Sequence, residues 1–391
     1  MGRMKAFVVV ALAAGSLALL GSCTNPVLSA VKGMKLIASE QGDTLYHDAA
    51  IAANGGTLYV AYKDPNAGTL KFTTSSDNGE TWTAPYEIDS STNVGAAPYA
   101  SVDGSTIYVD YWNSAGSLPK WNVITGGGSA GAPTGGNPRP VSAIVFLRTM
   151  TDSTGTYAFY TDKANLYCST WSSSSGWALF QLTVGPWTSG YPGGDTGRGT
   201  LSVSRMSTTS IFAVAWANAG RVYCNVTHDN NGTAWSHQTI PTSGSEDATA
   251  VASTFTASTL CVAYYDATST HVRFVRSTNE GDTWDSSKDL GSVNLGTSSS
   301  INDLGICTCS DQKLAVVFWD ASGMHSVSSA DSGVTWTAQP TLSDWGTSFT
   351  DDFEGNDGHL YLLTSVNNTT NGVKTQKLVM LKSEDNGATW Y

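Results

Sequence analysis

One eight-residue pattern, Ser-x-Asp-x-Gly-x-Thr-Trp, occurs four times in this chain and constrains its fold more than any other feature. The copies occupy residues 75–82, 277–284, 329–336 and 383–390, with Asn279 at the aspartate position of the second copy. Each copy predicts a tight hairpin turn, because the Asp or Asn side chain accepts backbone N–H groups and Gly adopts positive φ without steric cost. The Trp closes the hairpin as a large apolar lid. A pattern of this length that recurs four times indicates a repeat protein.

The turns belong to a longer repeating unit. An apolar strand that ends in aromatic and Asp or Asn residues recurs at 58–64, 107–113, 157–162, 212–218, 260–266, 314–320 and 360–367. The spacing is about 50 residues, within the range of propeller blades. A preceding strand is expected at 48–53, 98–103, 141–147, 200–205, 249–255, 304–309 and 349–354. A third strand leads into each turn, and an outer strand follows it.

Four strands in each of seven units predict an all-β chain folded as a seven-bladed β-propeller. The turn pattern is degenerate in units two to four, so six blades is the alternative, with the glycine-rich segment 126–138 as a long loop. The last unit ends at Tyr391 without an outer strand, while 34–39 forms a strand without a unit. We expect this N-terminal strand to pair into the last blade, which would remove two open sheet edges. Residues 34–391 are then one domain.

The eight-residue pattern resembles the Asp-box (BNR) repeat of the sialidase superfamily of β-propellers. The resemblance implies the propeller fold and places the Asp-box turns at the junction of the third and fourth strands. We call this side of the propeller the turn face. Loops from outer to inner strands and from second to third strands open on the opposite side, the funnel face. Because a turn-forming Asp already has a structural role, we expect function on the funnel face.

The first 22 residues predict a secretory signal peptide. Arg3 and Lys5 precede an apolar run too short to span a membrane comfortably, and small residues follow it. The sequence Leu20-Gly21-Ser22-Cys23 resembles a bacterial lipobox, which implies lipidation of Cys23. We therefore expect a lipid-anchored protein of the cell envelope, at the outer membrane or cell surface, with 23–33 as its tether.

Charge and cysteine content exclude several classes of function. Removal of the first 22 residues takes away two positive charges and changes the formal net charge from −12 to −14, which disfavours nucleic acid as a partner. The five remaining cysteines follow neither a disulfide framework nor zinc-ligand spacing, and we interpret them mainly as small buried residues. We expect no metal, no cofactor, no nucleic-acid partner and a monomer.

Aromatic and polar side chains at strand ends form the candidate ligand site on the funnel face, since aromatic rings and carboxylates together suit sugar rings and their hydroxyl groups. The candidates are Asp48, Tyr62, Asp64, Trp112, Arg139, Tyr160, Asp162, Arg198, Trp216, Glu246, Asp247, Tyr265, Asp266, Asp303, Trp319, Asp320 and Asp352. Each also has a structural interpretation, because Asp starts turns and strand-end aromatics pack between blades.

The resemblance to sialidases implies a three-arginine clamp, a Tyr–Glu nucleophile and an Asp acid/base. The family's Arg-Ile-Pro motif is absent, and Tyr46-His47-Asp48 stands in its place. We therefore expect a propeller that binds a glycan or a protein on its funnel face. The alternatives are a glycoside hydrolase, sialidase-like or with an acid pair, and an assembly scaffold.

Overall fold

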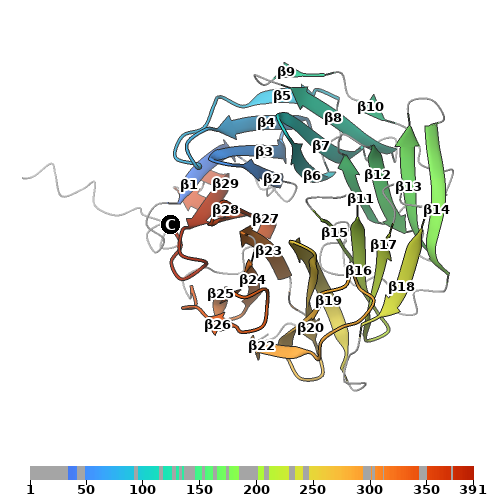
Figure 1. Ribbon diagram of the computed structural model, residues 1–391. Coiled ribbons are helices and arrows are strands. Elements are labelled where there is room, and N and C mark those ends of the chain that lie inside the picture. The colour runs from blue at the N-terminus through green and yellow to red at the C-terminus, as the bar shows by residue number, and fades with distance from the viewer. Residues whose placement is uncertain are drawn as a thin grey trace, which may run out of the picture.

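The structure is a computed structural model in which 29 strands form seven antiparallel sheets around a central axis (Figure 1). The described residues are 34–41, 49–91, 96–113, 118–125, 129–131, 134–135, 146–151, 155–161, 165–172, 176–184, 201–206, 211–228, 234–240, 246–293, 301, 304–310, 312–342, 350–370 and 373–391. The seven-bladed β-propeller is confirmed, and the six-bladed alternative is wrong. No helix capable of crossing a membrane occurs within these ranges. The predicted signal peptide and tether lie outside the described residues.

Each blade is built from consecutive strands that run outward from the axis. The inner strands are β2 (Ala49–Asn54), β6 (Ala96–Asp103), β11 (Phe146–Thr151), β15 (Leu201–Arg205), β19 (Ala248–Thr256), β23 (Leu304–Ser310) and β27 (Thr350–Asn356). The second strands are β3 (Thr57–Lys63), β7 (Thr106–Asn113), β12 (Thr156–Thr161), β16 (Phe212–Asn218), β20 (Thr259–Asp266), β24 (Lys313–Asp320) and β28 (His359–Thr370). The second strands carry much of the core, and those of blades four to six are buried along nearly their whole length.

The third and outer strands complete the blades. The third strands are β4 (Leu70–Ser75), β8 (Leu118–Thr125), β13 (Asn165–Ser172), β17 (Arg221–Thr227), β21 (His271–Ser277), β25 (Gly323–Ser329) and β29 (Val373–Ser383). The outer strands are β5 (Tyr86–Asp89), β14 (Gly176–Val184), β18 (Trp235–Thr239), β22 (Lys288–Ser292) and β26 (Thr337–Ala338), and two short strands, β9 (Ser129–Ala130) and β10 (Thr134–Gly135), in blade two. Blade two, which lacks the turn pattern, thus has the most fragmented outer edge.

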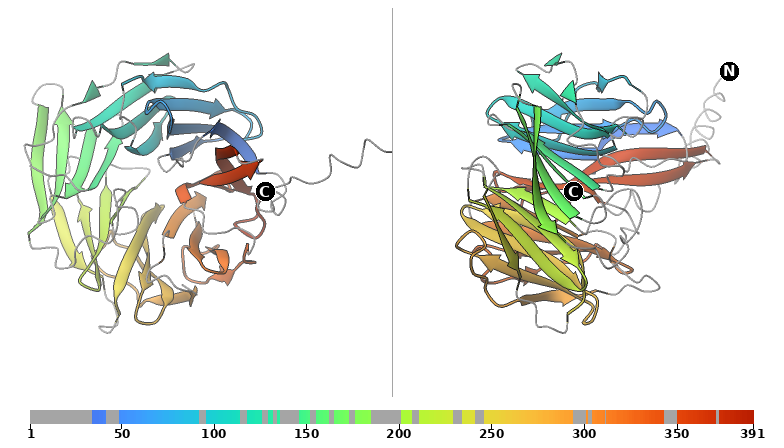
Figure 2. Two further views of the ribbon diagram at one scale, coloured as in Figure 1. Left: turned by 180° about the vertical axis from the view of Figure 1, so that it is seen from behind. Right: turned by 90° about the vertical axis from the view of Figure 1, so that its right-hand side faces the viewer.

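The N-terminal strand closes the ring as expected. β1 (Lys35–Gln41) is the outer strand of blade seven and pairs antiparallel with β29, so the sheet order is β1-β29-β28-β27. Ile37 is buried in the cluster between blades seven and one, against residues such as Leu58 and Met380. The two long strands β28 and β29 project past the neighbouring blades in the side view (Figure 2, right). Backbone pairing and apolar burial therefore join β1, the first strand of the propeller, to β29, its last strand.

Deletion of β1 should destabilise the propeller and expose a sheet edge. A form that begins at residue 42 should unfold at least about 5 °C below one that begins at residue 34, because it loses the burial of Ile37 and the pairing with β29. It should also self-associate, since an unpaired strand edge recruits other strands. Calorimetry and light scattering of the two forms test this. Equal transition temperatures and equal masses would contradict the closure.

One predicted inner strand can be compared only in part. The sequence places the inner strand of blade three at 141–147, of which 141–145 lie outside the described residues, and β11 spans Phe146–Thr151. β11 pairs with β12, with Leu147 opposite Tyr160 and Thr151 opposite Thr156. The other inner and second strands agree with expectation to within a few residues.

The four eight-residue turns share one hydrogen-bond network. In the turn of blade six, Ser329 Oγ accepts from the Gly333 amide at 2.8 Å and donates to Asp331 at 2.8 Å. The Asp331 carboxylate also accepts from the Thr335 amide at 2.8 Å and from its hydroxyl at 2.6 Å. These bonds hold the pKa of Asp331 at about 2. The turns at 75–82, 277–284 and 383–390 repeat the pattern, and the glycines have φ between 82° and 92°.

Each of these turns also packs on the third strand of the preceding blade in the ring. A Cβ at Gly333 would lie 2.4 Å from the Phe274 ring, and a Cβ at Gly281 would lie 2.8 Å from Val226. The Gly387 carbonyl accepts a hydrogen bond from Ser326 at 2.9 Å. Glycine is thus required both for its φ and for close approach to the preceding blade. The repeated turn fastens neighbouring blades together at the turn face.

Asn279, which occupies the aspartate position of the blade-five turn, indicates how Asp331→Asn should affect stability. Asn279 accepts from the Thr283 amide at 2.9 Å and contacts its hydroxyl, so an amide supports the same turn. We expect Asp331→Asn to change the free energy of unfolding by less than about 0.5 kcal/mol, and Asp331→Ala to lower it by about 1 to 2 kcal/mol. Urea denaturation of both variants at pH 7 provides the measurement. Equal losses would show that charge, and not the hydrogen-bond pattern, holds the turn.

Candidate functional site

The funnel face is described only in part. Five of the residues predicted to line it lie outside the described residues: Asp48, Arg139, Asp162, Arg198 and Asp303. The remaining candidates stand at the ends of second strands or at the starts of inner strands, as expected. Their role as ligand contacts stays a prediction.

The aromatic candidates at the funnel end of the second strands are mostly buried. Tyr62, Tyr160, Trp216, Tyr265 and Trp319 are each at most 4% exposed, and Trp112 is half-buried. Their rings pack within the blades; for example, Trp216 stacks on Tyr223 with ring centroids 5.5 Å apart, and Tyr160 stacks on Tyr167 at 5.3 Å. These side chains support the floor of the funnel face and present little surface to a ligand.

The carboxylates that end the second strands are engaged in their own turns. Asp64 accepts from the amides of Asn66 and Ala67 at 2.8 and 2.9 Å and pairs with Lys71 at 2.5 Å. Burial acts to raise its pKa, but the hydrogen bonds from Lys71 and the turn amides outweigh burial and lower it. These contacts hold the Asp64 carboxylate in the turn between β3 and β4.

Asp266 and Asp320 behave in the same way. Asp266 accepts from the amides of Asp247 and Thr268, each at 3.0 Å, and from the Ser269 hydroxyl. Asp320 accepts from the Ser322 amide at 2.7 Å and lies 2.9 Å from His325. The predicted Asp residues are therefore brought to one face of the ring but act there as turn caps.

The carboxylates on and beside the inner strands differ in environment. Glu246 accepts from the Tyr264 hydroxyl at 2.8 Å, and Asp247 is exposed. Asp352 accepts from its neighbour Phe353 and from the Ile51 amide of the next blade, each at 3.0 Å. This bond satisfies an inner-strand N–H that would otherwise lack a partner. Of these candidates, Asp247 alone offers an exposed side chain to solvent.

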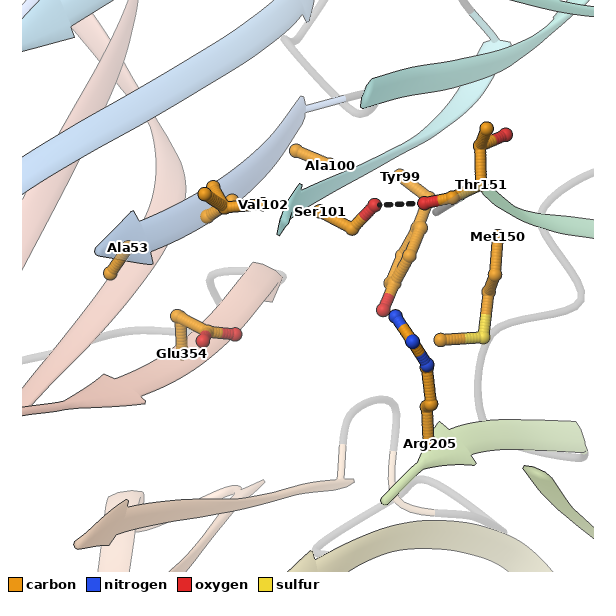
Figure 3. Close-up of a pocket in the computed structure, with 10 residues that line it drawn as sticks. Ala53, Tyr99, Ala100, Ser101, Val102, Met150, Thr151, Arg205 and Glu354 are labelled. Atoms are coloured by element: carbon orange, nitrogen blue, oxygen red, sulfur yellow. Dashed lines mark hydrogen bonds between the residues drawn. The ribbon is translucent and has the colours of Figure 1, made fainter. Parts of the chain in front are cut away.

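A cavity of about 180 Å³ lies among the inner strands on the side of the turn face (Figure 3). Its charged and hydroxyl-bearing lining residues are Arg205 at the end of β15, Glu354 on β27, Tyr99 and Ser101 on β6, and Thr151 at the end of β11. Ser101 donates a hydrogen bond to the Thr151 carbonyl at 3.0 Å. None of these residues was among the predicted site residues. For Arg205 the signal is a charged residue at the end of an innermost strand whose other residues are small or apolar. Glu354 lies in a strand with two Asp residues and one Asn, and carries no such signal.

The ionisable groups around the cavity are strongly perturbed. Burial, and secondarily the nearby Asp352, raises the pKa of Glu354 to about 8. Burial also raises the pKa of Tyr99, whose ring carries the Arg148 guanidinium 4.8 Å from its centroid. Asp110 lies opposite Tyr99 in the sheet, is 1% exposed, and has a pKa that burial raises to about 7. Perturbed groups gathered at a cavity mark a candidate functional site.

The described arginines do not form a three-guanidinium clamp. Arg148 and Arg205 lie near the cavity, whereas Arg273 and Arg276 on β21 pair with Asp289 and Asp285. No group of three or more metal-ligating side chains occurs in the part of the chain that the structure describes. The five cysteines Cys168, Cys224, Cys261, Cys307 and Cys309 are all buried free thiols, as expected for apolar packing.

Comparison with known proteins adds information on the fold. No protein-family model and no curated protein matches this chain. Among solved structures, "YCF48 bound to D1 peptide" is similar, with 13% identity and a TM-score of 0.50 over 88% of this chain and 99% of that one. The phage phi92 endosialidase has 11% identity and a TM-score of 0.48 over 89% and 68% of the two chains, and the polysaccharide lyase Uly1 has 10% and 0.47 over 90% and 93%. At this identity the likeness to YCF48 shows the β-propeller fold alone.

Proposed function

We propose that this chain is a ligand-binding β-propeller, held at the bacterial cell envelope by a lipid on Cys23, whose ligand binds on the funnel face. The ligand is a glycan or a segment of a partner protein. The observation that carries the proposal is the engagement of the funnel-face carboxylates Asp64, Asp266 and Asp320 in their own turns. These groups build a rigid rim, and a rigid rim suits recognition.

The same observation weighs against hydrolysis. Glycoside hydrolysis needs two carboxyl groups about 5 to 9.5 Å apart that face each other across a cleft, one of them protonated. Glu246 and Asp247 are adjacent in the chain, and Glu246 is bonded to Tyr264. Asp352 bridges the backbones of two blades. Glu246 and Asp352 are thus both engaged in hydrogen bonds within the fold.

Two further features support the choice of ligand. The β28–β29 hairpin, which joins the second and third strands of blade seven, projects beyond the neighbouring blades and would offer a partner an extended surface (Figure 2, right). The YCF48 structure, similar over nearly its whole length, holds a D1 peptide. A peptide therefore stands beside a glycan as a candidate ligand class.

Binding to glycan and peptide arrays tests the proposal. The protein used is residues 23–391 with Cys23→Ser, which removes the lipid site and leaves the propeller intact. We expect saturable binding to one ligand class, weakened about tenfold by Asp247→Asn at the funnel face. The control is Asp357→Asn, the same change at an exposed turn on the opposite face. Absence of binding to both arrays, or equal effects of the two variants, would contradict the proposal.

A further inference from the structure

The cavity among the inner strands is separate from the proposed funnel-face site. It is lined by the last residues of β11 and β15 and by the second halves of β2 and β27, which places it near the turns between first and second strands. The amide of Asn78, in the first eight-residue turn, donates to the Gly56 carbonyl in one such turn, so these turns lie on the turn face. The cavity thus belongs to the opposite half of the central channel.

Two opposite charges point into this cavity from different blades. Arg205 reaches in from blade four and Glu354 from blade seven, with open space between them (Figure 3). The Tyr99 hydroxyl end lies beside the Arg205 guanidinium. The rest of the wall is small or apolar, with Ala53 and Met150 among its members, apart from the hydroxyl-bearing Ser101 and Thr151. The cavity therefore presents a guanidinium end and a carboxyl end.

The Glu354 carboxyl group makes no hydrogen bond or ion pair to another residue of the described chain. Burial in such a place disfavours the charged form, and the raised pKa of Glu354 agrees with this. A cationic or hydrogen-bond-donating group placed beside Glu354 would stabilise its ionised form. The Glu354 carboxyl group is therefore available to bind a cationic or hydrogen-bond-donating group of a ligand.

The size of the cavity limits what can fill it. A cavity of about 150 Å³ accepts a molecule the size of benzene, and this one is about 180 Å³. We infer that the cavity is a second ligand site that takes a small zwitterion of about six to ten non-hydrogen atoms. Arg205 would bind its carboxylate through the planar guanidinium fork, and Glu354 would bind its ammonium group. A free α-amino acid of the size of alanine or serine has this chemistry.

Calorimetric titration of residues 23–391 carrying Cys23→Ser tests the inference at pH 8.5, where Glu354 is largely ionised. The probes are L-alanine and L-serine, with propionate and ethylamine as analogues that keep one charged end each. We expect saturable binding of at least one amino acid, and binding of both analogues weaker by about tenfold or more. Equal binding of ethylamine would overturn the zwitterion in favour of a simple cation site. Absence of heat with every probe would overturn the site.

Variants separate the two ends of the site. Glu354→Gln preserves shape and should weaken amino-acid binding about tenfold, and Arg205→Gln should weaken both amino-acid and propionate binding. The control is Arg221→Gln, an exposed arginine on β17, which should bind as the unmodified protein does. Because Glu354→Gln introduces no new charge, it remains informative if the arginine variant folds poorly. Unchanged affinity in Glu354→Gln would overturn the assignment, and array binding at the funnel face should be unaffected by it.

Discussion

Replacing Gly333 by alanine should lower the free energy of unfolding by about 3 to 4 kcal/mol. Two costs add at this position. Gly333 has a φ of 82°, which disfavours any residue with a Cβ, and the added Cβ would lie 2.4 Å from the Phe274 ring of the preceding blade. Either the turn or the ring must move, and both belong to the contact between blades five and six. Urea denaturation followed by tryptophan fluorescence measures the loss.

Gly358 supplies the matched control. Its φ is 83°, but a Cβ there would meet no atom within 4 Å. Gly358→Ala should therefore show the backbone cost alone, about 1 to 2 kcal/mol. The difference between the two variants isolates the packing of the turn on its neighbour. Equal losses would mean that the eight-residue turns do not fasten the blades.

Asp110→Asn should stabilise the propeller at pH 8 by about 2 to 4 kcal/mol. Asp110 lies on β7, is 1% exposed, and has one carboxyl oxygen without a hydrogen-bond partner. Its other oxygen accepts from the Thr151 hydroxyl at 2.8 Å, a bond that an amide oxygen retains. Because burial raises the folded-state pKa to about 7, ionisation at higher pH is resisted by the fold. The asparagine carries no charge to desolvate.

The contribution of Asp110 to stability depends on pH because its pKa differs between the folded and unfolded chains. In the unfolded chain Asp110 ionises near pH 4, whereas in the folded chain it stays protonated until about pH 7. Its contribution to stability is thus fully present below pH 4, falls between pH 4 and 7, and stays constant above. The advantage of Asp110→Asn should grow over this window in paired denaturation series. A difference that does not vary with pH would contradict a buried neutral Asp110.

Asp331 provides the opposite trend as a control. The hydrogen bonds from Thr335 lower its pKa to about 2. Its contribution is present above the unfolded value and is lost as pH falls from about 4 towards 2. The difference between Asp331→Asn and the unmodified protein should therefore change only in the acid range. The stability contribution of Asp110 thus changes between pH 4 and 7, and that of Asp331 changes between about pH 4 and 2.

The repeat and its turns were predictable because their cause is local. Ser329, Asp331, Gly333 and Thr335 bond to one another within seven residues, so the sequence pattern alone defines the turn. Closure by β1 followed from a strand without a blade at one end and a missing outer strand at the other. Both inferences use information that lies along the chain.

The cavity and the burial of the strand-end aromatics depend on positions across blades. Arg205 and Glu354 are about 150 residues apart, and nothing along the chain indicates that they point into one space. Likewise, Tyr265 and Trp319 read equally well as ligand contacts or as packing residues until the neighbouring blade is placed. In the structure each ring is at most 4% exposed, which shows how they pack and leaves their role as ligand contacts a prediction.

Product analysis after binding distinguishes most directly between a funnel face that binds its ligand and one that hydrolyses it. Residues 23–391 with Cys23→Ser would be incubated with the glycans that they bind on the array, with a fluorogenic sialoside, and with a panel of polysaccharides, and the mixtures analysed by mass spectrometry. If the funnel face only binds, bound ligand is recovered intact and the sialoside releases no fluorophore above the buffer control. Cleavage that disappears in Glu246→Gln or Asp247→Asn would contradict binding alone, and would make the funnel face a hydrolytic active site.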